Sequence, residues 1–437
     1  MPHSNLDDIA LDRRALLRSG ALFGGGALLA GTPLSGLLAQ AGPAWPNVTA
    51  LVNRFVDARQ VANIVTALGW GQQPQPQVIA KGVTTIGEAS PAGLDTLYRI
   101  YSMTKPITGM AAMILIDEGK LGLDQPVHDV LPAFRNMMVQ KTYDGSITDL
   151  VPAVRPITIR HLLTHTAGLG YGIIQKGPIK TYYEDHGIIP GQVSRIPIPG
   201  FDRGRPVQGL DKFADALAKA PLVYQPGTKW SYSVSLDLLG RVIEVAASMP
   251  FDEFLQARIF APTGMTSTWF RVPASEVGRL TTNYGILNGM PLPIDPARAS
   301  IYLDQPAFPF GGAGLVSSPR DYDRFLRMLL GYGAIDGKRV MSEKAVRLGT
   351  SNLLPDGVTG AGFGAGGGFG AGGRVAEGSF GWGGAAGTAG FVNFAANLRA
   401  GMFTQYMPSE ALPIQSGFPE AVLKDLAAMA PAKKVAA

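Results

Sequence analysis

The chain has 437 residues, of which 46% are hydrophobic and 16% charged, a composition typical of a globular rather than a disordered protein. Its formal net charge is only +5, and no basic run alternates with aromatic residues, which argues against a nucleic-acid partner. Cysteine is absent, so disulfides, thiolate catalysis and cysteine-ligated zinc are all excluded.

The first 41 residues have the pattern of an export signal. Arg13 and Arg14 precede a weakly hydrophobic, glycine-rich stretch, and Ala39-Gln40-Ala41 offers a cleavage site before Gly42. This arrangement resembles a bacterial twin-arginine leader. A membrane-anchoring helix is the alternative, but the glycines disfavour a stable span. We therefore expect residues 1–41 to be a cleaved signal peptide and the protein to be periplasmic or secreted.

The first part of the mature chain predicts helices and short strands. Apolar residues at helical spacing predict a helix over 48–69. Stretches rich in β-branched residues predict strands over 77–89 and 96–102. The apolar spacing then predicts a helix over 102–118, which Gly119 would end as a C-terminal cap.

The middle of the chain predicts mainly helices. Thr158 has the pattern of a helix N-cap, and further helices are expected over 211–220, over 235–247 and from Pro250 onward. Residues 170–210 differ, because they hold many glycines and prolines and show no clear period. A loop of this length in a compact domain is more often functional than idle, so we expect it to form a wall over a substrate cleft.

The last part of the chain mixes helices and strands. Ser318, followed by Pro319, has the pattern of a helix start. Residues 357–387 hold 15 glycines, but no G-K-[ST] follows them, so strands with closely approaching backbones are expected rather than a phosphate loop. Two strands over 387–409 and a helix over 418–430 complete the pattern.

Strands near both ends of the mature chain, with helices between them, predict one discontinuous α/β domain. Its α/β part is expected at about residues 42–120 and 300–437, and a mostly helical insertion at about 121–299.

Ser102 and Lys105 stand one turn apart at the start of the helix expected over 102–118. Residues three apart on a helix are neighbours, so the lysine nitrogen can reach the serine oxygen. The helix N-terminus also supplies unpaired N–H groups that can hold an oxyanion. Burial would lower the lysine pKa toward the value that a base needs near neutral pH. The alternative is a capping serine beside a solvated lysine.

Other catalytic arrangements have little support in the sequence. No G-x-S-x-G elbow occurs. His161 and His165 are four residues apart, but the intervening Leu-Leu-Thr lacks the glutamate of a zinc protease, so both are expected to be structural. His128 and His186 have no motif around them. We therefore expect neither a metal nor another cofactor.

Five sequence blocks occur in a fixed order: "SMTKPITG" around Ser102, "HLLTHTAGL" from His161, "QPGTKWSYSVSLDLLGRVIE" from Gln225, "GGAGLVSSPRDYDRF" from Gly311 and "GWGGAAGT" from Gly381. Together they resemble the serine β-lactamase and penicillin-binding-protein superfamily, and most closely the class C β-lactamase-like family VIII carboxylesterases. The resemblance covers most of the mature chain. It implies a β-lactamase/transpeptidase-like catalytic domain over residues 42–437, with an antiparallel sheet flanked by helices.

The resemblance also implies roles for individual residues. Ser102 would be the nucleophile, Lys105 its activator and Tyr232 a second base, whose phenolate the Lys105 ammonium would stabilise. The backbone N–H groups of Ser102 and Ala385 would form the oxyanion hole. The third motif of the family, K-T-G in lactamases, falls on the segment Trp382-Gly383-Gly384.

Two departures from the lactamase pattern bear on the substrate. Val234 stands where lactamases have an asparagine, and Trp382 and Gly383 stand where a lysine and a threonine would bind the substrate carboxylate. The site therefore lacks a fixed cation and polar donors, which favours an uncharged, apolar acyl ester. In this reading Val234, Trp382, Gly383 and Gly384 contact the substrate.

We therefore expect a serine carboxylesterase that hydrolyses short-chain, small-molecule esters through an acyl-enzyme on Ser102. A β-lactamase, a D-amino-acid peptidase or an amide hydrolase on the same scaffold is the alternative among enzymes. A non-catalytic relative that binds cell-wall peptides is the alternative outside them, although such a protein has no use for Ser102, Lys105 and Tyr232 together.

Overall fold

A seven-stranded antiparallel sheet forms the centre of the fold, with strand order β11-β12-β13-β14-β15-β1-β2. The computed structural model describes residues 45–198, 204–358, 367–376 and 378–429, so the predicted leader lies outside the described residues. The strands of this sheet are β1 Asn63–Trp70, β2 Gln77–Gly82, β11 Gly367–Phe369, β12 Arg374–Ala376, β13 Ser379–Gly383, β14 Ala389–Asn393 and β15 Leu398–Phe403.

Strands from the two ends of the described chain pair within the sheet, where β15 lies next to β1. Val65 of β1 lies opposite Phe403 of β15. The smaller sheets are formed by β3 Tyr98–Arg99 with β8 Val316–Ser317, β4 Met138–Gln140 with β5 Leu150–Pro152, β9 Ala334–Ile335 with β10 Lys338–Arg339, and β6 Asn283–Leu287 with β7 Met290–Asp295 and β16 Tyr406–Met407.

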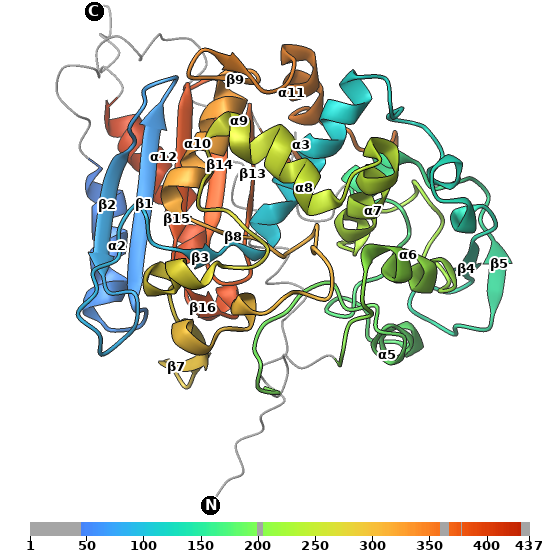
Figure 1. Cartoon of the computed structure of the whole chain (residues 1–437), viewed down its shortest axis with the longest axis horizontal. Helices are drawn as coiled ribbons and strands as arrows, with labels where there is room; N and C mark the ends of the chain where they lie inside the picture. The colour runs from blue at the N-terminus through green and yellow to red at the C-terminus, as the bar shows by residue number, and fades with distance from the viewer. Residues whose placement is uncertain (1–44, 199–203, 359–366, 377, 430–437) are drawn as a thin grey trace, which may run out of the picture.

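Helices cover both faces of the large sheet (Figure 1). Side chains alternate along β1, so Ile64 packs with α2 and α12 while Val65 packs in the core that includes α3 and α10. The helices are α2 Pro46–Asp57, α3 Thr104–Asp117, α4 Ile159–Leu163, α5 Pro178–Asp185, α6 Leu210–Ala218, α7 Ser235–Ala247, α8 Phe251–Leu255, α9 Ala261–Thr263, α10 Pro319–Leu330, α11 Glu343–Gly349 and α12 Ile414–Met429. Among the described residues, no helix is long and apolar enough to cross a membrane.

The helices predicted over 211–220, over 235–247 and after Ser318 are confirmed as α6, α7 and α10. Thr158 and Ser318 are N-caps as predicted: each side-chain oxygen accepts a backbone N–H three residues on. Helices α5, α6 and α7 lie to one side of the sheet, and α3 lies between them and the sheet (Figure 1). The division of the domain at about residues 120 and 300 stays a prediction.

The helix predicted over 48–69 is wrong in its second half. Helix α2 ends at Asp57, Arg59 has a positive φ of 56°, and β1 follows. All eight residues of β1 are buried, so the strand is covered on both faces and does not show the two-residue period of a half-buried strand. The predicted loop over 170–210 also contains a helix, α5, whose eight residues are too few to establish a period.

The glycine-rich segment forms β11, β12 and β13 where it is described, as predicted; residues 359–366 and Glu377 lie outside the described residues. Its backbone does approach its neighbours closely. A Cβ on Gly381 would lie 2.3 Å from the carbonyl oxygen of Gly390 on β14, and one on Gly372 would lie 2.2 Å from that of Lys105. Glycine therefore lets this edge of the sheet pack against α3.

Candidate active site

Ser102 lies in a short 3₁₀ turn, Tyr101–Met103, which leads directly into α3. The α-helix therefore begins two residues later than predicted, at Thr104. Lys105 lies in its first turn and is 1% exposed, and its Nζ is 3.2 Å from Ser102 Oγ. The solvated lysine of the alternative reading is thus excluded. Burial lowers the pKa of Lys105, while the neighbouring Tyr171 and Asp237 raise it.

Tyr232 reaches the same serine from the segment before α7. Its hydroxyl donates a hydrogen bond to Ser102 Oγ at 2.8 Å, and Lys105 Nζ lies 4.6 Å from the centre of its ring. Burial raises the pKa of Tyr232, and its hydrogen bonds with Ser102 and Trp382 oppose that shift only in part. In the free protein, burial thus favours the neutral phenol over the phenolate that the resemblance implies.

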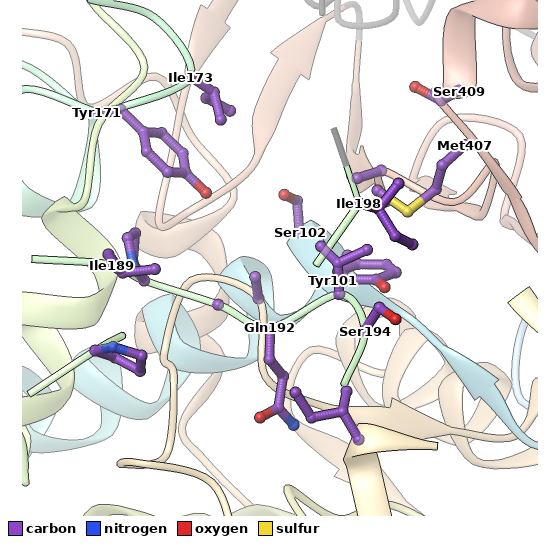
Figure 2. Close-up of a pocket in the computed structure, with 18 of the residues that line it drawn as sticks. Tyr101, Ser102, Tyr171, Ile173, Ile189, Gln192, Ser194, Ile198, Met407 and Ser409 are labelled. Atoms are coloured by element: carbon purple, nitrogen blue, oxygen red, sulfur yellow. The ribbon is translucent and has the colours of Figure 1, made fainter. Parts of the chain in front are cut away.

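A cavity of about 620 Å³ opens above these groups, and its lining includes Ser102 and Tyr232. Residues 189–198 form much of one wall, as predicted for the long loop. In Figure 2 the hydroxyls of Ser102 and Tyr171 both point into the space between them. The lining of the cavity includes several aliphatic side chains, namely Ile173, Ile189, Val193, Ile196, Ile198, Ile301 and Met407. Tyr171 was missed in the sequence, because it lies in a segment without a period.

The end of β13 and the residues after it also line the cavity, with Trp382, Gly383, Gly384 and Ala385. A Cβ on Gly384 would lie 2.4 Å from the carbonyl oxygen of Ile100, two residues before Ser102. This contact brings the end of β13 against the turn that carries Ser102. It therefore also brings Ala385 to the mouth of the same cavity.

Trp382 contacts the predicted catalytic group as well as the cavity. Its indole Nε1 donates to the hydroxyl of Tyr232 at 3.4 Å, and the two ring centres are 5.9 Å apart. Val234 is placed differently from the prediction. It is fully buried, does not line the cavity, and donates its backbone N–H to the carbonyl of Gly170. The assignment of Val234 as a substrate contact is corrected, because its side chain belongs to the core at the start of α7.

Both histidines of the predicted structural pair are packed into the fold. His161 completes a capping box on α4 with Thr158, and burial is the main cause that lowers its pKa to about 4. His165 is fully buried against the ring of Tyr232, its Nδ1 accepts the backbone N–H of Ser233, and burial lowers its pKa. Within the described ranges, no cluster of three or more metal-ligating side chains occurs.

Comparisons with known proteins agree with this geometry. Residues 52–416 match the family described as Beta-lactamase. The chain is 37% identical over 307 residues to Protein Rv1367c of Mycobacterium tuberculosis, which covers 70% of this chain and 72% of that protein. It is 34% identical over 265 residues to Esterase EstB of Burkholderia gladioli, which covers 57% of this chain and 61% of the esterase.

Among solved structures, the fold is similar to "EstCE1, a hydrolase with promiscuous acyltransferase activity", with a TM-score of 0.67 and 26% identity. The similarity covers 86% of this chain and 97% of the other. The predicted β-lactamase/transpeptidase-like fold is therefore confirmed. The chain belongs to the beta-lactamase family and is a serine hydrolase, and its similarity to Esterase EstB agrees with the resemblance drawn from the five sequence blocks.

Proposed function

We propose that this protein is a serine carboxylesterase that forms an acyl-enzyme on Ser102. The observation that carries the proposal is the convergence of Lys105 Nζ and the Tyr232 hydroxyl on one serine oxygen, 3.2 and 2.8 Å away, at a largely aliphatic cavity. A nucleophile within hydrogen-bond reach of a base and a second proton carrier is the arrangement that acyl transfer requires. The relative named Esterase EstB supports the same substrate class.

In the acylation step, the neutral amine of Lys105 accepts the Ser102 proton while Oγ attacks the ester carbonyl carbon. The backbone N–H groups of Ser102 and Ala385 are proposed to hold the resulting oxyanion. When the tetrahedral intermediate collapses, the C–O bond to the alcohol breaks. Tyr232 gives its proton to the departing oxygen and regains one from Lys105, so the protons balance.

Water completes the cycle. It attacks the acyl-enzyme carbonyl and gives a proton to the Lys105–Tyr232 pair, which returns it to Ser102 Oγ as the acid leaves. An alcohol in place of water would give acyl transfer. This second candidate is favoured by the cavity of about 620 Å³, since it has room for an alcohol beside a small acyl group. The promiscuous acyltransferase activity of EstCE1 supports it as well.

Esters are proposed as substrates in preference to β-lactams, peptides or amides. No lysine or threonine stands at Trp382 and Gly383 to bind a lactam carboxylate. Arg195 and Arg205 both line the cavity, and Arg195 is paired with Asp304 at 2.7 Å. Short acyl groups, up to about butyrate or hexanoate, remain our proposed preference. An aryl ester series tests it, and acyl chains longer than hexanoate that are turned over faster than butyrate would contradict it.

Covalent labelling tests the function directly. A fluorophosphonate probe should add one label, on the peptide that contains Ser102, and abolish ester hydrolysis. Labelling that survives Ser102→Ala unchanged would contradict the nucleophile assignment. A wild-type protein that binds cell-wall peptides but neither reacts with the probe nor hydrolyses esters would favour the non-catalytic alternative.

The protein is further proposed to act in the periplasm or outside the cell. The paired Arg13 and Arg14 and the cleavage pattern Ala39-Gln40-Ala41 support this location.

A further inference from the structure

Asp237 is a buried carboxylate close to the proposed catalytic groups, although it does not line the cavity. It lies in the first turn of α7, five residues after Tyr232, and is 2% exposed. Its Oδ1 accepts the backbone N–H of Gly312 at 2.9 Å. Burying a carboxylate costs free energy unless hydrogen bonds or opposite charges compensate the loss of water. The groups that stabilise Asp237 in the core therefore have to be identified.

Gly312 connects this carboxylate with Lys105. The carbonyl oxygen of Gly312 accepts a hydrogen bond from Lys105 Nζ at 2.6 Å, while its N–H donates to Asp237. The lysine and the aspartate thus bind the two polar groups of one residue. Burial raises the pKa of Asp237 to about 7, and the Lys105 charge acts against that shift. The two side chains therefore favour each other's charged forms.

The glycines of this segment make the contact possible. A Cβ on Gly312 would lie 2.5 Å from Asp237 Oδ2, and one on Gly311 would lie 2.5 Å from the carbonyl oxygen of Leu236. On the other side, Thr108 Oγ1 of α3 donates to the Gly311 carbonyl at 2.7 Å. The backbone of residues 311–312 is therefore held between α3 and α7.

This arrangement fixes the direction of the flexible Lys105 side chain. Lysine has a four-carbon stem, and its nitrogen must stay within hydrogen-bond reach of Ser102 to act as a base. The Gly312 carbonyl is the shorter of its two hydrogen-bonded contacts, 2.6 Å against 3.2 Å to Ser102. Displacement of a catalytic group by about 1 Å is enough to cost about a hundredfold in rate.

We propose that Asp237 is a positioning residue of this site, which holds the Gly312 carbonyl in place and thereby keeps Lys105 directed at Ser102. The proposal rests on the proposed function, since it assigns Lys105 the role of the base. Asp237 itself acts through Gly312 and not on the substrate.

Two substitutions of Asp237 distinguish the effect of its hydrogen bond with Gly312 from the effect of its negative charge. Asp237→Asn keeps an oxygen that can accept the Gly312 N–H but removes the negative charge. Asp237→Ala removes both. Asp321 provides a matched control, because it is also buried in the first turn of a helix and accepts a backbone N–H, that of Ser267, but does not line the cavity. Asp321→Ala therefore reports the effect of losing such an aspartate away from Lys105.

The measurements are kcat and KM for an aryl butyrate, and the second-order rate of Ser102 labelling by a fluorophosphonate. Asp237→Ala should lower kcat and the labelling rate about ten- to a hundredfold with KM little changed, while Asp237→Asn loses less than tenfold. Asp321→Ala should keep the wild-type labelling rate per folded molecule. Rates are expressed per folded molecule, measured by circular dichroism, so that a loss of folding alone does not count.

The pH dependence of kcat/KM is a further measurement, and it would not change if Asp237 had a purely structural role. The titratable groups around Lys105 are Tyr171, Tyr232, His165 and Asp237. Because Asp237 raises the pKa of Lys105, Asp237→Asn should move the rising limb of the kcat/KM profile to lower pH.

Wild-type labelling rates and pH profiles in both Asp237 variants would overturn the proposal. So would losses no larger than those of Asp321→Ala. If the wild type hydrolysed no ester but Asp237→Ala still slowed the labelling of Ser102, the positioning role would stand and the esterase assignment would fall.

Discussion

The indole N–H of Trp382 donates to the hydroxyl oxygen of Tyr232, which itself donates to Ser102. Trp382 therefore lines the cavity and also forms a hydrogen bond with Tyr232, the proposed proton carrier. A lysine at this position, as in lactamases, would put a charge where this chain has an aromatic donor. The residue that replaces the lactam-binding lysine thus helps to orient the phenol.

Trp382→Phe should lower kcat/KM for aryl esters about two- to tenfold, because it keeps the ring but removes one neutral hydrogen bond to Tyr232. Steady-state hydrolysis measures the effect. Trp70→Phe is the control, since Trp70 is also buried but packs in the core with α2 and α12. Equal losses of kcat/KM in both variants would mean that Trp382 contributes only to the stability of the fold.

Lys105→Ala and Tyr232→Phe should each lower kcat by about 10²–10⁴-fold, the range for losing a general base or acid. The double variant should lose less than the product of the two, because both groups contact the same serine oxygen. Single-turnover kinetics with a chromogenic ester measures this coupling. Strictly multiplicative losses would show that the two groups act independently.

Aryl esters should be hydrolysed with a higher kcat/KM than a chromogenic cephalosporin. Each charged hydrogen bond missing from the lactam carboxylate costs roughly 1.5–3 kcal/mol, or about ten- to a hundredfold. A threonine grafted at Gly383 would have to displace the side-chain amide of Gln415, because its Cβ would lie 2.8 Å from Nε2 of that residue. A cephalosporin rate equal to that of the aryl butyrate would refute the ester preference.

The free energy of unfolding should depend on pH through Asp237. Burial raises its pKa from an ordinary 3.8 to about 7, so the folded protein keeps a proton that the unfolded chain has released. The stabilisation from this proton is complete below about pH 4 and is lost as the pH rises to about 7. Asp237→Asn removes the titration.

Urea unfolding at several pH values checks the sign. The stability of the wild type, relative to Asp237→Asn, should fall between about pH 4 and 7. A difference that does not change across this window would show that the carboxylate titrates near its ordinary pKa.

The mature N-terminus should lie near Gly42 when the protein is made in its native host. N-terminal sequencing of the exported protein checks this expectation. Replacing Arg13 and Arg14 with lysine should leave the longer precursor inside the cell, because the paired arginines are the export signal in this reading. A wild-type chain recovered whole, beginning at Met1 or Pro2, would contradict a cleaved leader.

Features set by neighbouring residues were predictable from the sequence. The caps Thr158 and Ser318 bond to groups three residues away, and the bounds of α7 follow from its apolar face. Ser102 and Lys105 share one helical turn, so their contact could be expected. Tyr232 could be placed only through the resemblance to a family.

Other features depend on distant parts of the chain. The link from Asp237 to Lys105 runs through the backbone of Gly312, and a glycine in sequence does not reveal which groups its peptide contacts. The helix predicted over the residues of β1 is wrong because both faces of this strand are covered, so its sequence lacks the two-residue period of a half-buried strand. Val234 was placed at the substrate by alignment with a motif, whereas the packing at the start of α7 turns it into the core.

The pairing of β1 with β15 has a consequence for synthesis on the ribosome. Strand β1 emerges early, but the partner of Val65 is Phe403, so one whole edge of β1 stays unpaired until nearly the entire chain has been translated. Loop closure over so long a separation is slow, and an exposed apolar edge invites aggregation. The nascent protein therefore has most need of a chaperone in the interval between these two strands.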